Sequence, residues 1–190
     1  DIGNRNIKIG TTDKGGHFSS VYYLNDEFKE TTEQTAKYVL VISNKDLNNS
    51  DSEYNVERNA NYLNQFIQSQ DGENGIVPEL IAHGYCENGK NKRVWKIIQK
   101  FGKSLEGELI TNSLLLTIYK KIIEFHDKTG LVHFDIAKRN ILINDEENDE
   151  GKIRLIDFGL SLFNNQPIVH GLYPSLYRNL FLNYDKKARK

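Results

Sequence analysis

The feature that most constrains the fold is the segment 131–159, in which acid and amide side chains stand next to short apolar runs. Asp135 and Asn140 lie five residues apart in it, and Asp157 follows the second of two such runs. Short runs rich in β-branched residues predict strands. We therefore expect three oxygen-bearing side chains at the ends of short strands.

These residue types suit one kind of chemistry. Carboxylate and amide oxygens are the ligands that Mg²⁺ prefers in proteins. Transfer of a phosphoryl group to a hydroxyl needs a carboxylate near the incoming hydroxyl and oxygen ligands for magnesium, with little covalent chemistry besides. Asp135, Asn140 and Asp157 together meet that demand.

Strands are predicted wherever apolar residues alternate or cluster in short runs. A polar loop, 25–34, joins the predicted strands 17–24 and 38–43. A turn at 87–89 joins strands 77–83 and 93–99, and the acidic stretch 144–151 joins strands 141–143 and 153–156. The predicted strands are 17–24, 38–43, 77–83, 93–99, 141–143 and 153–156.

Three helices are predicted. One begins near Asp51 and carries apolar residues at spacings of four, three and four as far as Ile67. The second has an apolar stripe, Asn112 or Ser113 as its N-cap and Gly130 as its stop signal. The third closes the chain after Pro174, which suits a first helical position.

Composition narrows the class of protein. The chain has 190 residues, of which 38% are hydrophobic, enough for one compact unit or two small lobes that share a cleft. A net charge of -1 gives no reason to expect nucleic acid as a partner. No apolar run approaches the roughly 18 residues that span a bilayer. The single cysteine, Cys86, suits a reducing compartment.

The central segment also resembles a known pattern. Residues 131–140, Leu-Val-His-Phe-Asp-Ile-Ala-Lys-Arg-Asn, are similar to the protein kinase catalytic loop H-R-D-x-x-x-x-N. Residues 157–159, Asp-Phe-Gly, match the kinase D-F-G motif, and both lie at the expected separation. The resemblance implies an enzyme with ATP and Mg²⁺ as cofactors.

By that resemblance, Asp135 orients the acceptor hydroxyl, and Asn140 and Asp157 bind magnesium and the nucleotide. Either Lys138 or Arg139 supplies positive charge to the γ-phosphate, and Lys138 is counted among the catalytic residues.

Residues 14–22, Lys-Gly-Gly-His-Phe-Ser-Ser-Val-Tyr, are similar to the glycine-rich loop of kinases. Only Gly16 of the three glycines is in register. The resemblance implies that the backbone at Gly16 covers the phosphates and that Val21 packs on the adenine.

Residues 95–105 look like the fifth strand and hinge of casein kinase I and the vaccinia-related kinases. Ile98 is then the gatekeeper residue, and the backbone of Gln99 and Phe101 hydrogen-bonds the adenine. This group is the nearest in pattern to the chain.

The sequence departs from the family on the third strand. Kinases carry there a lysine that pairs with the ATP phosphates and with a glutamate of the N-lobe helix. The best register puts Val41 at that position, with Lys37 or Lys14 as candidate substitutes. Glu53 or Glu57 is the candidate partner on the helix.

Two catalytic-loop positions also differ. Phe134 replaces the arginine that reads activation-loop phosphate in many kinases, which argues against control of that kind. Ala137 and Arg139 are similar to the tyrosine-kinase loop, whereas the hinge resembles a serine/threonine group. The loop therefore leaves the type of acceptor hydroxyl open.

The expected fold class is α+β, a protein-kinase-like two-lobe fold in a single domain over 1–190. Its N-lobe, about 1–98, is an antiparallel sheet with one helix, its hinge is about 99–102, and its C-lobe, about 103–190, is helical and truncated. Minimal kinases of this build occur among bacterial secreted effectors and viruses. The expected location is therefore the cytoplasm, or a host cytoplasm after secretion.

Three functions fit the sequence. The first is an ATP- and magnesium-dependent protein kinase acting on a Ser, Thr or Tyr hydroxyl of a protein, which in a host setting is a host protein. The second is a pseudokinase that binds a nucleotide or docks to a partner, which Val41 favours. The third is a small-molecule kinase of related fold.

Overall fold

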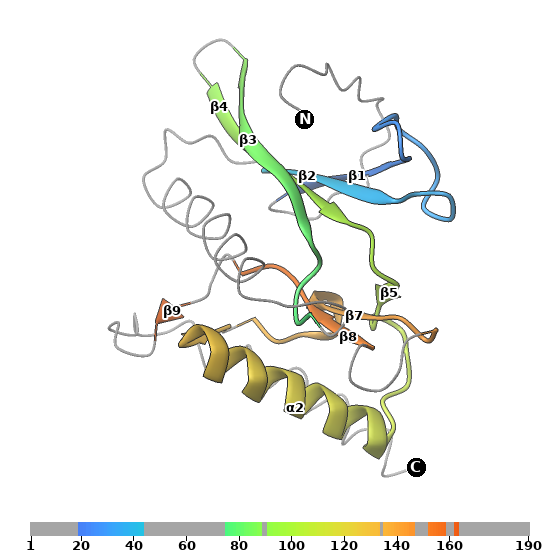
Figure 1. Cartoon of the computed structure of the whole chain (residues 1–190), viewed down its shortest axis with the longest axis vertical. Helices are drawn as coiled ribbons and strands as arrows, with labels where there is room; N and C mark the ends of the chain where they lie inside the picture. The colour runs from blue at the N-terminus through green and yellow to red at the C-terminus, as the bar shows by residue number, and fades with distance from the viewer. Residues whose placement is uncertain are drawn as a thin grey trace. The chain divides into compact units, whose positions relative to one another are not determined.

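The computed structural model describes residues 19–43, 75–88, 91–133, 135–146, 152–158 and 162–163. They fall into two compact units (Figure 1). The first contains residues 19–43 and the described part of 78–100, and the second contains 75–77 and the described residues from Phe101 onward.

The first unit is built on a four-stranded antiparallel sheet in the order β1-β2-β4-β3. The strand pairs predicted around 17–24 and 38–43, and around 93–99, are confirmed. The strands are β1 Ser19–Leu24, β2 Tyr38–Ser43, β3 Leu80–Asn88 and β4 Asn91–Gln99.

One face of this sheet is packed. Leu24, Leu40 and Ile97 are buried there and form a cluster that we call the sheet core. Trp95 packs against the sheet core, and its indole lies over Gly84 on the neighbouring strand, where a Cβ would come within 2.8 Å of the ring. Because side chains along a strand point alternately to the two faces of the sheet, the residues between these packed ones project from the opposite face.

The start of β3 differs from the prediction. The strand predicted from Val77 begins at Leu80, and Val77 itself belongs to the second unit. The Ile76 carbonyl accepts a hydrogen bond of 2.7 Å from the Leu155 N–H, and Pro78 has no N–H to donate to a ladder. The other end runs on to Asn88, so the turn predicted at 87–89 falls partly inside the strand.

The described part of the second unit holds two small sheets. The larger has the antiparallel order β5-β7-β8 and the smaller pairs β6 with β9. The predicted strands at 141–143 and 153–156 are confirmed, the latter ending at Leu155. The elements are β5 Lys103–Ser104, β6 Leu131–Val132, the 3-10 helix η1 Lys138–Asn140, β7 Ile141–Ile143, β8 Ile153–Leu155 and β9 Leu162–Phe163.

Helix α2, Asn112–Thr129, lies in the second unit and confirms the second predicted helix. The predicted cap at Asn112 or Ser113 is wrong by one or two positions, because Thr111 is the N-cap and its hydroxyl accepts from the Leu114 N–H at 3.2 Å. Gly130 ends the helix with a left-handed φ of 63°, as predicted.

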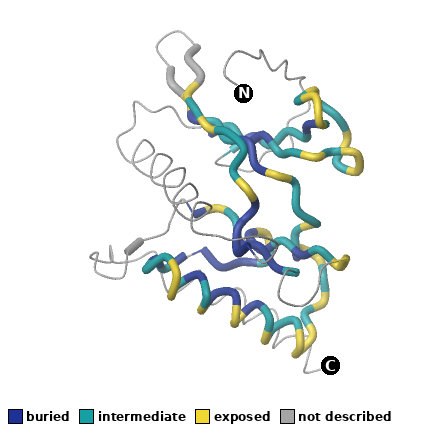
Figure 2. Tube along the Cα trace, viewed as in Figure 1, coloured by how far each residue is buried: buried dark blue, intermediate teal, exposed yellow. Residues whose placement is uncertain are grey.

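Buried and exposed residues alternate along α2 with helical spacing (Figure 2). Ile118, Ile122 and Phe125 are buried, while Leu116 and Ile123 are exposed. The buried stripe fixes which side of α2 faces the core of its unit.

Several predictions lie outside the described residues. They are the helix after Asp51, the helix after Pro174, most of the glycine-rich segment including Gly16, and the residues Lys14, Glu53, Glu57, Phe134 and Gly159. Of the helices that the structure describes, none has the length and apolar character needed to cross a membrane.

Candidate functional site

The loop between β6 and η1 begins with a buried histidine that connects two parts of the second unit. His133 has no exposed surface. Its Nδ1 accepts from the Asp135 N–H at 3.2 Å, so Nε2 carries the proton and donates to the Ile156 carbonyl at 3.0 Å. Burial lowers the pKa of His133 to about 4, which keeps the ring neutral near pH 7.

His133 also packs in an aromatic cluster. Its ring centroid lies 4.8 Å from that of Phe158 and 5.9 Å from that of Phe125, and the two phenylalanine rings stack at 5.2 Å. Phe158 is the middle residue of the Asp-Phe-Gly segment. The cluster thus joins α2, the loop of Asp135 and the segment after β8 into one packed arrangement.

Asp135 is buried, and its carboxylate is held by two neighbours. Asn140 Nδ2 donates to Asp135 Oδ2 at 2.8 Å and to the Asp135 carbonyl at 2.9 Å. Arg139 Nη2 donates to both carboxylate oxygens at 2.8 Å. The side chain therefore has a fixed position with charge-assisted hydrogen bonds on both oxygens.

The same contacts orient Asn140. Its amide nitrogen faces Asp135, so Oδ1 is the atom that can serve as a ligand for a cation. Asn140 is buried and ends the 3-10 helix η1, immediately before β7. The short helix positions Asn140 five residues from Asp135, the spacing that the sequence pattern singled out.

Asp157 follows β8 and is exposed. The Ile156 N–H donates to the Asn140 carbonyl at 3.0 Å, so the backbone of the residue before Asp157 is bonded directly to Asn140. Asp157 itself has a φ of 65°, a left-handed value uncommon for residues other than glycine. Backbone strain of this kind concentrates at functional sites.

The structure separates Lys138 from Asp135. Lys138 Nζ donates to the Glu108 carbonyl at 2.7 Å, while the neighbouring Arg139 takes the place at the carboxylate. The Ser104 hydroxyl donates to the Lys138 and Arg139 carbonyls at 3.3 and 3.4 Å, which ties η1 to β5. Of the two cations left open by the sequence, Arg139 is the one beside Asp135.

The predicted nucleotide contacts divide between the two units. Val21 and Gln99 lie in the first unit and Phe101 in the second. The Gln99 N–H donates to the Glu79 carbonyl at 2.8 Å, so a contact of Gln99 with adenine would use its carbonyl. The Phe101 ring lies 4.4 Å below the Arg154 guanidinium.

Gly102 lies directly after Phe101 and has a φ of 41°. A Cβ at this position would collide with the Ile143 carbonyl oxygen of β7. Only glycine allows this close approach of the predicted hinge to the strand.

Val41, predicted to stand where kinases carry the lysine, lies between two strands of the sheet, with Val21 opposite it on β1 and Lys96 opposite it on β4. The candidate substitute Lys37 precedes β2, and its Nζ lies 3.2 Å from Asp26 Oδ2 in an exposed ion pair. The other candidate, Lys14, lies outside the described residues.

Sequence reasoning missed two features of this site. It assigned no role to His133, although the residue stands two positions before Asp135 in the pattern, and it did not decide between Lys138 and Arg139. The sequence did contain a signal for His133, because it lies in an apolar run. A histidine buried in such a run needs hydrogen-bond partners for both ring nitrogens.

A magnesium site here would need few protein ligands. Among the described residues, no three His, Cys, Asp or Glu side chains gather in a metal-binding cluster. Asn140 Oδ1 and the Asp157 carboxylate fit magnesium, which is commonly bound by one or two protein oxygens together with waters and substrate phosphates.

Comparison with known proteins points the same way as the motifs. No family model matches the chain. A probable serine/threonine-protein kinase of Clostridium acetobutylicum is 30% identical over 112 residues, covering 58% of this chain and 15% of that protein. A probable serine/threonine-protein kinase of Dictyostelium discoideum is 44% identical over 48 residues, covering 25% of this chain and 5% of that protein.

The chain thus spans a small part of the length of both relatives. These similarities support a kinase-like relationship over part of the chain, and the α+β architecture with its antiparallel sheet is compatible with a small kinase-like fold.

Proposed function

We propose that this chain acts as an ATP- and magnesium-dependent protein kinase, which transfers the γ-phosphate to a hydroxyl of a protein. The observation that carries the proposal is the buried Asp135 carboxylate, which Asn140 and Arg139 hold in place. The Asn140 carbonyl in turn accepts a hydrogen bond from Ile156, the residue before Asp157. A carboxylate placed in this way beside two oxygen ligands is what phosphoryl transfer requires.

In this proposal Asp135 receives the acceptor hydroxyl. Its two oxygens already accept three hydrogen bonds, and a carboxylate offers about four lone-pair positions, so one more donor can be accommodated. The hydroxyl donates to this position and gives up its proton there as its oxygen bonds to the γ-phosphorus, while the bond from that phosphorus to the β–γ bridging oxygen breaks and ADP leaves. Arg139 keeps the carboxylate aligned during this step.

Asn140 and Asp157 would hold magnesium, Asn140 through Oδ1 and Asp157 through its carboxylate. Magnesium bound with ATP supplies positive charge between the phosphates and lowers the barrier to transfer. The left-handed backbone of Asp157 and the bond from Ile156 to Asn140 keep these two residues at the ends of adjoining strands. Preorganised ligands avoid the cost of rearrangement when the nucleotide binds.

The kinase group that we propose as nearest to the chain is inferred from the hinge. We place the chain nearest to casein kinase I and the vaccinia-related kinases, since 95–105 resembles their fifth strand and hinge. Both relatives found by comparison are described as probable serine/threonine-protein kinases, which favours a Ser or Thr acceptor over Tyr.

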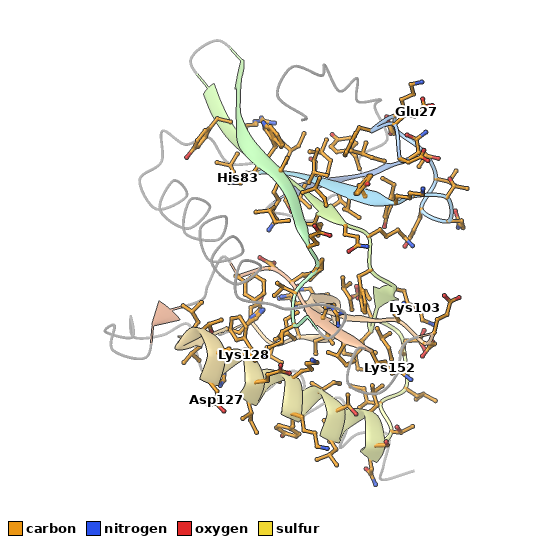
Figure 3. The ribbon with its side chains drawn as sticks, viewed as in Figure 1. Glu27, His83, Lys103, Asp127, Lys128 and Lys152 are labelled. Atoms are coloured by element: carbon orange, nitrogen blue, oxygen red, sulfur yellow. The ribbon has the colours of Figure 1, made fainter. Side chains whose placement is uncertain are left out.

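The test is transfer of label from γ-labelled ATP with magnesium to the chain itself and to a panel of protein substrates. Asp135→Asn and Asp157→Ala should each lower the rate at least about a hundredfold, because a catalytic base and a metal ligand are removed. Asp127→Asn, on the exposed side of α2, is the matched control and should behave as wild type (Figure 3).

A second candidate, a pseudokinase that binds nucleotide or a protein partner without turnover, is favoured by Val41. It would be supported if wild type bound ATP yet transferred no label to any protein. Equal labelling by wild type and Asp157→Ala would contradict the kinase proposal.

A further inference from the structure

Val41 leaves the proposed kinase without a cation at the position where the fold usually has one, and the sheet register offers another lysine there. Val41 is directly opposite Val21 on β1 and directly opposite Lys96 on β4. Side chains of directly opposed residues in an antiparallel pair project from the same face, with their Cβ atoms about 4.5–5.5 Å apart.

Side-chain packing confirms which face that is. Trp95 packs against the sheet core and covers Gly84, so it lies on the packed face. Lys96, the next residue along β4, must project from the opposite face. Val41 does so as well, because its neighbour Leu40 belongs to the sheet core.

The opposite face is also that of the residues predicted to contact the nucleotide. Val21, predicted to pack on adenine, is paired with Val41. The predicted gatekeeper, Ile98, is two residues from Lys96 on β4 and is paired with Val39, so it projects from the same face. A lysine stem is long enough to carry its ammonium group beyond its own strand. Lys96 is half-buried, which suits such a position.

Lys96 lies closer to Val41 than does Lys37, a substitute that the sequence suggested. Lys37 is four residues from Val41 along the strand direction, roughly 13 Å at strand rise. It is also exposed, with 63% of its side chain accessible, just before the start of the strand. Lys96 is one strand away from Val41, at less than half that separation.

We propose that Lys96 supplies the phosphate-binding charge that Val41 lacks, so that its ligands are the α- and β-phosphate oxygens of a magnesium nucleoside triphosphate. This rests on the proposed function. On β3, His83 is the residue directly opposite Lys96, so it lies on the other side of Lys96 from Val41. The face therefore carries a row of residues, from Val21 through Val41 and Lys96 to His83.

Calorimetric titration of the full chain with magnesium-ATP and, separately, with adenosine tests the proposal. Lys96→Met should weaken ATP binding at least about tenfold, the effect of losing one charge-assisted hydrogen bond. It should leave adenosine binding unchanged, because adenosine has no phosphate. Lys37→Met is the matched control and should bind both ligands as wild type does.

A second measurement uses a variant in which the lysine is moved from β4 to β2. In the double variant Val41→Lys, Lys96→Met, the charge returns to the same face one strand away, and ATP affinity should recover to within about threefold of wild type. Recovery would separate a charge requirement from a purely structural role of Lys96.

The outcomes distinguish the two proposals. If wild type binds and transfers phosphate from ATP, but Lys96→Met keeps its ATP affinity or Lys37→Met loses it, the role of Lys96 is overturned and the kinase proposal stands. If Lys96→Met weakens ATP and adenosine equally, Lys96 is structural and its proposed role is likewise overturned. If wild type binds no ATP at all, both proposals fall.

Discussion

At the scale of single residues, the site depends on two side chains that hold others in place. Arg139 donates to both oxygens of Asp135, and His133 bridges the Asp135 N–H and the Ile156 carbonyl. Neither is a metal ligand in our proposal. Both fix the positions of the residues that would contact the substrate or the metal.

Arg139→Ala should lower kcat about tenfold to a hundredfold and leave KM for ATP nearly unchanged. The reason is that, in our proposal, Arg139 aligns the Asp135 carboxylate for the acceptor, whereas Asn140 and Asp157 hold the magnesium nucleotide. Lys138→Ala should have the smaller effect on kcat, because Lys138 is bonded to the Glu108 carbonyl. Steady-state phosphotransfer kinetics of both variants would measure this, and a larger kcat loss in Lys138→Ala would contradict it.

The buried His133 predicts how stability depends on pH. Its pKa is about 4 in the folded chain and near 6.5 when exposed, so the unfolded chain binds more protons between these values. The contribution of His133 to the free energy of unfolding should therefore be constant above about pH 6.5. It should fall by about 3 kcal/mol as the pH drops to 4.

Urea unfolding at several pH values would measure this, with His133→Gln expected to lose most of the slope between pH 4 and 6.5. His126→Gln should remove a smaller part of the slope, since burial lowers the pKa of the half-buried His126 less. A His133→Gln chain with the full wild-type slope would show that His133 does not set it.

At the scale of elements, tertiary contacts decided what local pattern did not. The alternating runs of β1 and β2 and the apolar stripe of α2 are strong local signals, and these elements formed as predicted. The two-residue strands β5, β6 and β9 are too short to show periodicity, so the sequence could not predict them. The start of β3 moved because a carbonyl before it bonds to β8.

Gly102 shows a tertiary constraint of this kind and gives a stability prediction. Gly102→Ala should be strongly destabilising, by more than the 1 kcal/mol or so of a left-handed alanine, because its Cβ would also collide with the Ile143 carbonyl. Gly107→Ala is the matched control: it has a φ of 87° and open space for a Cβ, so it carries the backbone strain alone. Urea midpoints that are equal for the two variants would contradict the role of the close approach.

At the scale of the whole molecule, the sequence located the motif residues, and the structure added how they are held. Asp135, Asn140 and Asp157 could be predicted as site residues because they lie in two short motifs of specific chemistry, and their roles stay predictions. The choice of Arg139 over Lys138, and the position of Lys96 opposite Val41, depend on side-chain direction and strand register. Register is set by contacts between residues far apart in the chain, so one sequence without its fold does not reveal it.

The most direct test of the central claim is the magnesium-dependent transfer of γ-labelled phosphate from ATP to protein, followed by mass spectrometry of the labelled side chain. Our account predicts label on a Ser, Thr or Tyr hydroxyl with wild type and magnesium, and its loss with a chelator or in Asp135→Asn. Labelling that persists equally in Asp135→Asn, or none with any protein while ATP binds, would contradict it.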